Sequence, residues 1–144
     1  MNEHTALLLV DLQRDFINED LLMPPVGVLV EQVKALLTHC RAAGIPVFHT
    51  RTLVNADGAG RMPHWQRNGD QRCVKGTPGA QPPEGLESLP GEIVYNKSFY
   101  SAFGNPSLDN DLRQAGIQTL LVAGLHTHAC VQATVLRRRS QPAC

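Results

Sequence analysis

Two short apolar runs constrain the fold of this chain more than any other feature. Residues 6–10 and 119–123 are apolar or β-branched throughout and do not alternate with polar positions. A strand with this pattern is buried on both faces, which is typical of a parallel sheet covered by helices on both sides. Asp11 ends the first run and Gly124 ends the second. The runs therefore predict two buried strands of a parallel sheet.

The segments between these runs alternate between strand-like and helix-like patterns. Apolar residues recur at helical spacing over 28–43, and a second helix is expected between Asn105, a good N-cap, and Gly116. The predicted strands are 6–10, 47–50, 92–95 and 118–123. Alternating strands and helices predict an α/β fold, a doubly wound, mostly parallel sheet with helices on both faces.

The domain organisation follows from the length and from two irregular stretches. The chain has 144 residues, which is enough for one domain with its own core, so residues 1–144 are expected to form a single domain. Residues 52–91 contain many glycines and prolines and predict a long irregular loop over the sheet. Residues 137–144 form an atypical, arginine-rich tail that predicts a frayed end rather than a core helix.

Charge and hydropathy argue against two classes of partner. The chain has 13 Lys and Arg residues and 13 Asp and Glu residues, so its formal net charge is zero. It therefore lacks the positive charge that would attract nucleic acid or an anionic membrane. The N-terminus lacks a basic region, and the first apolar run is too short for a signal peptide or a membrane span. The expectation is a cytoplasmic protein with no nucleic-acid or membrane partner.

The four cysteines do not suggest a disulfide framework, because their spacing is irregular. Cys40 falls on the apolar face of a predicted helix and is expected in the core. Cys73 lies in a polar loop and Cys144 at the end, and neither is given a role. Cys130 differs, because it stands where a strand gives way to a helix. Nearby backbone N–H groups and the helix dipole would favour a thiolate there.

Asp11, Lys97 and Cys130 each follow a different predicted strand. The carboxyl ends of parallel strands meet at one edge of a sheet, where ligands bind, so these three residues are expected to converge. Taken one at a time, each has a plainer interpretation: Asp11 as a turn residue, Lys97 as a solvated lysine and Cys130 as a packing residue. Convergence at one edge favours a site with a nucleophile, a base and a cation.

Three motifs resemble the isochorismatase-like cysteine hydrolase family. They are residues 8–16 (LLVDLQRDF), residues 97–103 (KSFYSAF), and the last segment from Gly116-Ile117 through Gly124, Thr127 and Cys130-Val131 to Thr134. They occur in the family's order and cover nearly the whole chain. The resemblance implies a Rossmann-like three-layer fold and a catalytic triad of Asp11, Lys97 and Cys130.

The resemblance also implies finer features of the site. A non-proline cis peptide is expected between Leu125 and His126, with His126 lining the pocket and His128 only part of the turn. The amides of Ala129 and Cys130 would form an oxyanion hole. The implied activity is hydrolysis of a non-peptide C–N bond in a small amide, ureido or carbamoyl substrate through a thioester, with no cofactor.

Several roles stay open at this level. His126, His128 and Cys130 alternate and can be interpreted as metal ligands, but the Asp-x-His pattern of the family's metal-binding branch is absent after the second strand, so no metal is expected. Phe16 and Trp65 would wall the substrate or simply pack in the core. Arg51 or Arg67 would bind a substrate carboxylate.

The resemblance ends after Leu136, where family members continue into another strand and helix. We therefore expect the last strand and helix to be missing, with an unpaired sheet edge that favours association into a homo-oligomer. Two alternatives to amide hydrolysis remain. One is hydrolysis of the isochorismate vinyl ether, which needs no cysteine, and the other is an inactive α/β domain.

Overall fold

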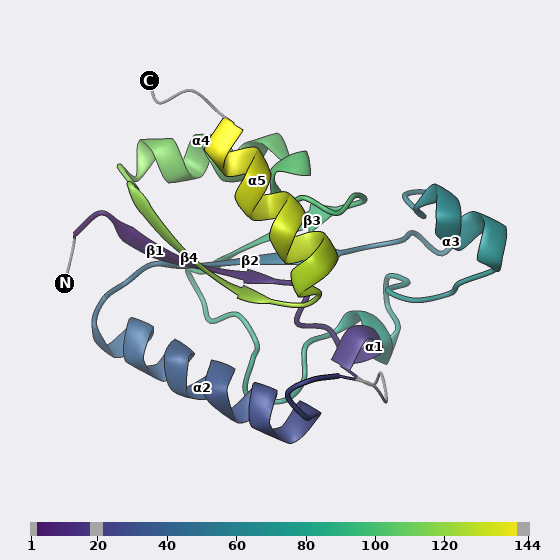
Figure 1. Cartoon of the computed structure of the whole chain (residues 1–144), viewed down its shortest axis with the longest axis horizontal. Helices are drawn as coiled ribbons and strands as arrows, with labels where there is room; N and C mark the ends of the chain where they lie inside the picture. The colour runs from purple at the N-terminus through teal and green to yellow at the C-terminus, as the bar shows by residue number, and fades with distance from the viewer. Residues whose placement is uncertain (1–2, 18–21, 141–144) are drawn as a thin grey trace.

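The computed structural model describes residues 3–17 and 22–140 of the chain (Figure 1). Within these residues, four strands form one parallel sheet in the order β3-β2-β1-β4. The strands are β1 (Thr5–Val10), β2 (Val47–Thr52), β3 (Ile93–Lys97) and β4 (Thr119–Gly124). The predicted parallel α/β sheet is confirmed, and the four predicted strands match to within a few residues at their ends.

β1 lies in the middle of the sheet, between β2 and β4. All six of its residues are buried, as expected for a strand covered on both faces. Its register places Leu7 beside Val47 and Val10 beside Gly124, so the carboxyl ends of β1, β2 and β4 lie together. Whatever follows these strands is therefore brought to one edge of the sheet.

Helices cover both faces of the sheet, as Figure 1 shows. Helix α2 (Val26–Ala42) packs against one face through Val33 and Leu37, in a core that includes Leu7 and Leu9 of β1. Helix α4 (Pro106–Gln114) packs against the other face, together with α5 (Gln132–Ser140). The alternating side chains of β1 thus stabilise two separate apolar layers.

The long insertion between β2 and β3 is less irregular than its composition predicts. It contains the short helix α3 (Pro63–Asn68) and one 3₁₀ turn, η1 (Pro78–Ala80). Pro63 starts α3 at its first position, and Gly69 ends it in the left-handed conformation at φ 69°. A bridge between Val54 and Val74 closes the base of the insertion. Short helix α1 (Arg14–Ile17) packs beneath it.

The C-terminal prediction needs a correction. Helix α5 continues to Ser140, so the arginine-rich stretch does extend the helix that follows Cys130. Residues 141–144, including Cys144, lie outside the described residues. Arginine has a high helix propensity, so a helix can continue through these residues even though they do not form an apolar face. In the described part of the chain, no helix is both long enough and apolar enough to cross a membrane.

Two further cysteines are placed in the core. Cys40 of α2 is buried, as predicted. Cys73 is also completely buried, although its neighbours are polar, and burial raises the pKa of its thiol. Cys73 does lie in the loop after α3, but its side chain packs in the same apolar cluster as Leu7 of β1 and Leu37 of α2.

Candidate active site

Three strands deliver the candidate residues to one edge of the sheet. Asp11 directly follows β1, Lys97 is the last residue of β3, and Cys130 lies in the turn after β4. Asp11 adopts a left-handed conformation at φ 54°, an uncommon state for a non-glycine residue that turns its side chain away from the strand direction. The predicted convergence is what the structure shows.

Gly124 allows the chain after β4 to fold tightly over β1. A Cβ at this position would lie 2.0 Å from the carbonyl oxygen of Val10, so no side chain fits. The close approach lets the Leu125 N–H donate to that same oxygen at 3.0 Å. The peptide bond between Leu125 and His126 is cis, at the position that the resemblance implies. This turn carries Cys130 toward Asp11.

The carboxylate of Asp11 is buried and fully engaged. Lys97 Nζ donates to Asp11 Oδ2 at 2.8 Å, and neither side chain is exposed to solvent. Asp11 Oδ1 accepts from the backbone N–H of Thr52 at 3.1 Å and from its hydroxyl at 3.0 Å. A buried ion pair is tolerated only when its remaining hydrogen-bonding positions are satisfied, and this one meets that condition.

Cys130 lies in a π-helical turn, η3 (Thr127–Val131), in which the Val131 N–H donates to the carbonyl of His126. Such wide turns are rare and occur often at functional sites. The turn is fastened by Thr134, whose hydroxyl donates to the Cys130 carbonyl at 2.7 Å and accepts from the Ala102 N–H at 2.9 Å. The backbone around Cys130 is thus held by hydrogen bonds to Thr134 and to His126.

The thiol of Cys130 is protonated at neutral pH. Burial and the negative charge of Asp11 raise its pKa to about 12, outweighing the lowering by Lys97 and by the backbone N–H of His126. The expectation that the helix start holds a resting thiolate is therefore wrong. The first physical reason is burial, which disfavours the charged form of the thiol, and the second is the neighbouring Asp11 carboxylate, which opposes a second negative charge.

The two backbone amides that are expected to form an oxyanion hole, those of Ala129 and Cys130, both lie in this turn. The Ala129 N–H donates to the His126 carbonyl at 3.0 Å, so any contribution it makes to an oxyanion would be shared with that bond. Cys130 itself carries the other predicted amide, within the same turn. The oxyanion hole stays a prediction.

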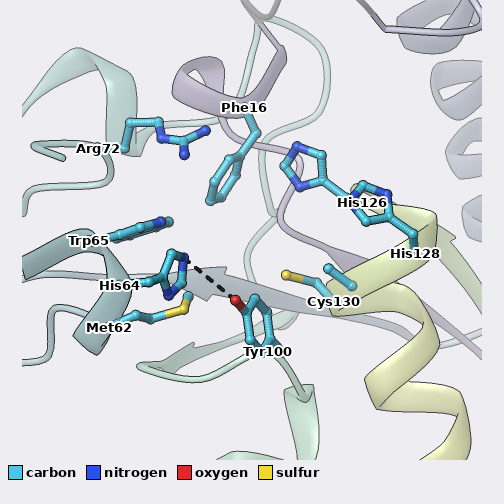
Figure 2. A pocket seen from close by; sticks show the side chains of 10 residues that line it. Phe16, Met62, His64, Trp65, Arg72, Tyr100, His126, His128 and Cys130 are labelled. Atoms are coloured by element: carbon cyan, nitrogen blue, oxygen red, sulfur yellow. Dashed lines mark hydrogen bonds between the residues drawn. The ribbon is translucent and has the colours of Figure 1, made fainter. Parts of the chain in front are cut away.

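A pocket of about 300 Å³ opens above Cys130 (Figure 2). Phe16, His126 and Ala129 line it close to the sheet edge. Opposite them stand residues of the insertion and of the loop after β3, which sequence patterns did not reveal because these segments have no periodicity. These are Met62, His64, Arg72 and Tyr100. The pocket is therefore built by two regions that are distant in sequence.

Phe16 and Trp65 both line the pocket and both belong to the core, so the two interpretations left open are true together. The Arg72 guanidinium lies over both rings, 5.5 Å from the centre of Phe16 and 5.3 Å from that of Trp65. Asp70 pairs with Arg72 at 2.8 Å and holds it there. Beside Trp65, His64 stacks on Tyr100 with ring centres 5.8 Å apart.

Two arginines that the sequence suggested for anion binding lie elsewhere. Arg51 lines a separate small cavity beside His49, and Arg67 is exposed on α3 away from the pocket lining. Arg72 is the arginine at the pocket instead. His128, expected only in the turn, also lines the pocket, and its ring meets the ring of His126 edge-on at 5.8 Å. Across the described residues, no three His, Cys, Asp or Glu side chains gather as metal ligands.

Comparison with known proteins identifies the family of this chain. A family model described as the isochorismatase domain matches residues 5–139. The chain belongs to the isochorismatase domain family. A ureidoacrylate amidohydrolase of Methylorubrum extorquens is 32% identical over 155 residues, covering 91% of this chain and 62% of that protein.

Solved structures of this family agree with the fold. An isochorismatase family protein from Desulfovibrio vulgaris superimposes with a TM-score of 0.81 at 33% identity, over 96% of this chain and 76% of that one. An N-carbamoylsarcosine amidase from Thermoplasma acidophilum superimposes with a TM-score of 0.77 at 27% identity, over 92% and 74%. The chain spans between 48% and 67% of the length of the curated relatives it matches first.

Proposed function

We propose that this chain is a cysteine hydrolase that cleaves a non-peptide C–N bond in a small amide, ureido or carbamoyl substrate. One observation carries the proposal: the Cys130 thiol lies against the buried Asp11–Lys97 pair at the floor of a pocket of about 300 Å³. Relatives named as ureidoacrylate amidohydrolase and N-carbamoylsarcosine amidase support the choice of bond.

The first chemical step uses the proton that the resting thiol carries. Asp11 accepts this proton as the Cys130 sulfur attacks the substrate carbonyl carbon, so the thiolate forms only when a substrate is present. Lys97 stays an ammonium and balances the charge through its bond to Asp11 Oδ2. Backbone N–H groups of the Cys130 turn would stabilise the developing oxyanion.

The second step releases an amine. Collapse of the tetrahedral adduct breaks the C–N bond, and Asp11 returns its proton to the leaving nitrogen, which departs as ammonia or an amine. The acyl group remains on Cys130 as a thioester. Water then attacks this thioester with Asp11 as base, which yields the acid and restores the thiol. One water is consumed for each bond cleaved.

The charges of the pocket favour a substrate with an acidic group. Among the described residues that line it, Arg72 carries a permanent positive charge, three are histidines, and none carries a carboxylate. Asp70 engages the Nε edge of Arg72, but a guanidinium has five N–H donors and can also bind a substrate carboxylate. The carboxylate would face Arg72 while the scissile carbonyl faces Cys130, across the pocket in Figure 2.

The test is ammonia release from ureidoacrylate and from N-carbamoylsarcosine. Wild-type protein should release ammonia, and Cys130→Ala should reduce the rate by about 10³-fold or more, because the covalent route is lost. Intact-mass spectrometry of the wild type, quenched in acid, should show the added acyl group. Hydrolysis that survives in Cys130→Ala at the wild-type rate would exclude the proposal.

A further inference from the structure

Thr52 is a buried polar residue of the site to which the proposed mechanism assigns no role. It is the last residue of β2, is completely buried, and lies between the two charged members of the triad. Its hydroxyl is 3.0 Å from Asp11 Oδ1 and 3.1 Å from Lys97 Nζ. A buried hydroxyl that bridges a carboxylate and an ammonium has little freedom in how it orients its hydrogen.

The direction of each hydrogen bond can be deduced from the donors. A lysine ammonium can only donate, so the Thr52 oxygen must accept from Lys97. The single hydrogen of the hydroxyl is then committed to Asp11 Oδ1. Lys97 uses its three hydrogens on Asp11, on Thr52 and on the carbonyl of Phe99 at 2.9 Å. The hydroxyl therefore cannot turn without breaking this network.

The same count applies to the Asp11 carboxylate, which has about four acceptor positions. Three are taken by the Thr52 N–H, the Thr52 hydroxyl and Lys97. The fourth is left for the Cys130 thiol, which lies near enough to Asp11 for the carboxylate to raise the thiol pKa. Because these three positions are occupied, the orientation of the carboxylate is fixed, and one acceptor position stays available on the side of Cys130.

Gln13 fixes the backbone of Thr52 in turn. Gln13 Nε2 donates to the Thr52 carbonyl at 2.8 Å, and Gln13 Oε1 accepts from the Thr52 N–H at 2.9 Å. The same Nε2 donates to the Ala80 carbonyl of the insertion at 3.0 Å. Thr52 is thus held from both sides, and its hydroxyl has a defined position relative to Asp11.

We propose that Thr52 is a positioning residue whose hydroxyl aims the proton-accepting lone pair of Asp11 at the Cys130 sulfur. The inference rests on the proposed function, since it assigns Asp11 as the base of that reaction. It predicts that loss of the hydroxyl slows the chemical step and also releases the thiol from Asp11. Loss of the hydroxyl should therefore lower kcat and raise the rate of Cys130 alkylation.

The experiment compares Thr52→Val, which removes the hydroxyl at nearly constant volume, with Thr52→Ser, which keeps it. Thr50→Val is the matched control, because Thr50 is a buried threonine on the same strand whose hydroxyl bonds only a backbone carbonyl, that of Leu9. In hydrolysis of ureidoacrylate, Thr52→Val should lower kcat about 10- to 100-fold with KM within about twofold, because misplaced catalytic groups cost about that much. Thr52→Ser and Thr50→Val should stay near wild type.

The second measurement needs no substrate. At pH 8, the rate of Cys130 alkylation by iodoacetamide should rise about three- to tenfold in Thr52→Val, because the hydrogen bond to Asp11 that raises the thiol pKa is lost. Cys40 and Cys73 are both buried and serve as internal controls. Their rates should not change, since a faster reaction there would mean that the whole fold had loosened.

The outcomes separate the two proposals. If the wild type hydrolyses neither substrate, the proposed function fails, and the alkylation of Cys130 alone decides the role of Thr52. Thr52→Val with kcat and Cys130 alkylation both at wild-type values would overturn the inference, as would Thr52→Ser with the defect of Thr52→Val. If Thr52→Val does not fold by thermal melting, Thr52→Ala takes its place in the same comparison.

Discussion

The two sides of the pocket are built in different ways. On the sheet edge, Asp11, Thr52 and Lys97 are buried, and their polar atoms are matched to one another. On the insertion, His64 and Arg72 are only partly buried and contact their neighbours through ring stacking and an ion pair. The residues at the sheet edge are thus fixed by buried polar contacts, whereas the pocket wall from the insertion is held by more exposed contacts.

This difference has a physical basis. Parallel strands end together and are joined by ladder hydrogen bonds, on both sides for β1 and β2 and on one side for β3 in the described sheet, so residues at their ends have little freedom. A loop on the surface can change its sequence without disturbing the sheet. We therefore expect substitutions at the sheet edge to alter rate, and substitutions on the insertion to alter substrate affinity.

The largest effect should come from Asp11→Asn at the sheet edge. Hydrolysis should fall about 10³-fold because the base is lost. Alkylation of Cys130 at pH 8 should rise about tenfold or more, since the charge of Asp11 raises the thiol pKa. Ammonia release and peptide mass spectrometry give the two rates. Asp57→Asn, an exposed carboxylate, is the control, and slower alkylation in Asp11→Asn would contradict this account.

Gly124→Ala should have the next largest effect. The added Cβ would meet the Val10 carbonyl at 2.0 Å, so β4 must move away from β1. The free energy of unfolding should fall by about 3 kcal/mol, at the upper end for overpacking. Urea denaturation measures this change. Gly27→Ala in α2, where a Cβ meets nothing within 4 Å, should be neutral or slightly stabilising. Equal stabilities of the two variants would show that β4 tolerates the shift.

On the insertion, Arg72→Gln should act on affinity. KM for ureidoacrylate should rise about tenfold with kcat within about threefold, because one charge-assisted hydrogen bond contributes about 1.5 kcal/mol. Arg67→Gln on α3 is the matched control, because Arg67 is exposed and absent from the pocket lining. Steady-state kinetics decide the point. A drop in kcat with unchanged KM would place Arg72 in the chemistry instead.

The smallest effect on activity is expected from Glu92→Gln, where the insertion returns to β3. Glu92 bonds Arg41, His49 and the Leu89 N–H, which holds its pKa at about 2 against the usual 4.5. The depressed pKa stabilises the fold fully above pH 4.5, and this contribution disappears as the pH falls toward 2.

The loss of stability in Glu92→Gln should therefore be about 2–3 kcal/mol at pH 7 and should shrink between pH 4.5 and 2. Urea denaturation at a series of pH values measures it. Glu31→Gln is the control, because Glu31 is exposed and pairs only with Lys34 one turn away. A difference between wild type and Glu92→Gln that stays constant with pH would contradict the assignment.

The sequence alone predicted the architecture and the convergence of Asp11, Lys97 and Cys130 at one edge of the sheet. Unbroken apolar runs marked β1 and β4 as parallel strands, and the ends of three strands marked Asp11, Lys97 and Cys130. The predicted burial is confirmed for β1 alone: β4 is the last strand of the described sheet, none of its residues is buried, and Leu121 is 40% exposed. These signals are local, because a strand's burial pattern and its end are written in neighbouring residues. The extent of α5 was not predicted, because its arginines do not form the apolar, core-facing pattern that marks a helix in the sequence.

Only the tertiary structure decided the rest of the site. Thr52 bonds Asp11 across 41 positions of sequence, and Arg72 reaches the pocket because the insertion packs on Phe16. The protonated state of Cys130 depends on burial and on the distance to a carboxylate, and neither is encoded locally. The residues that meet at this edge of the sheet can be found from where strands end, but their partners and charges arise from contacts that exist only once the chain has folded.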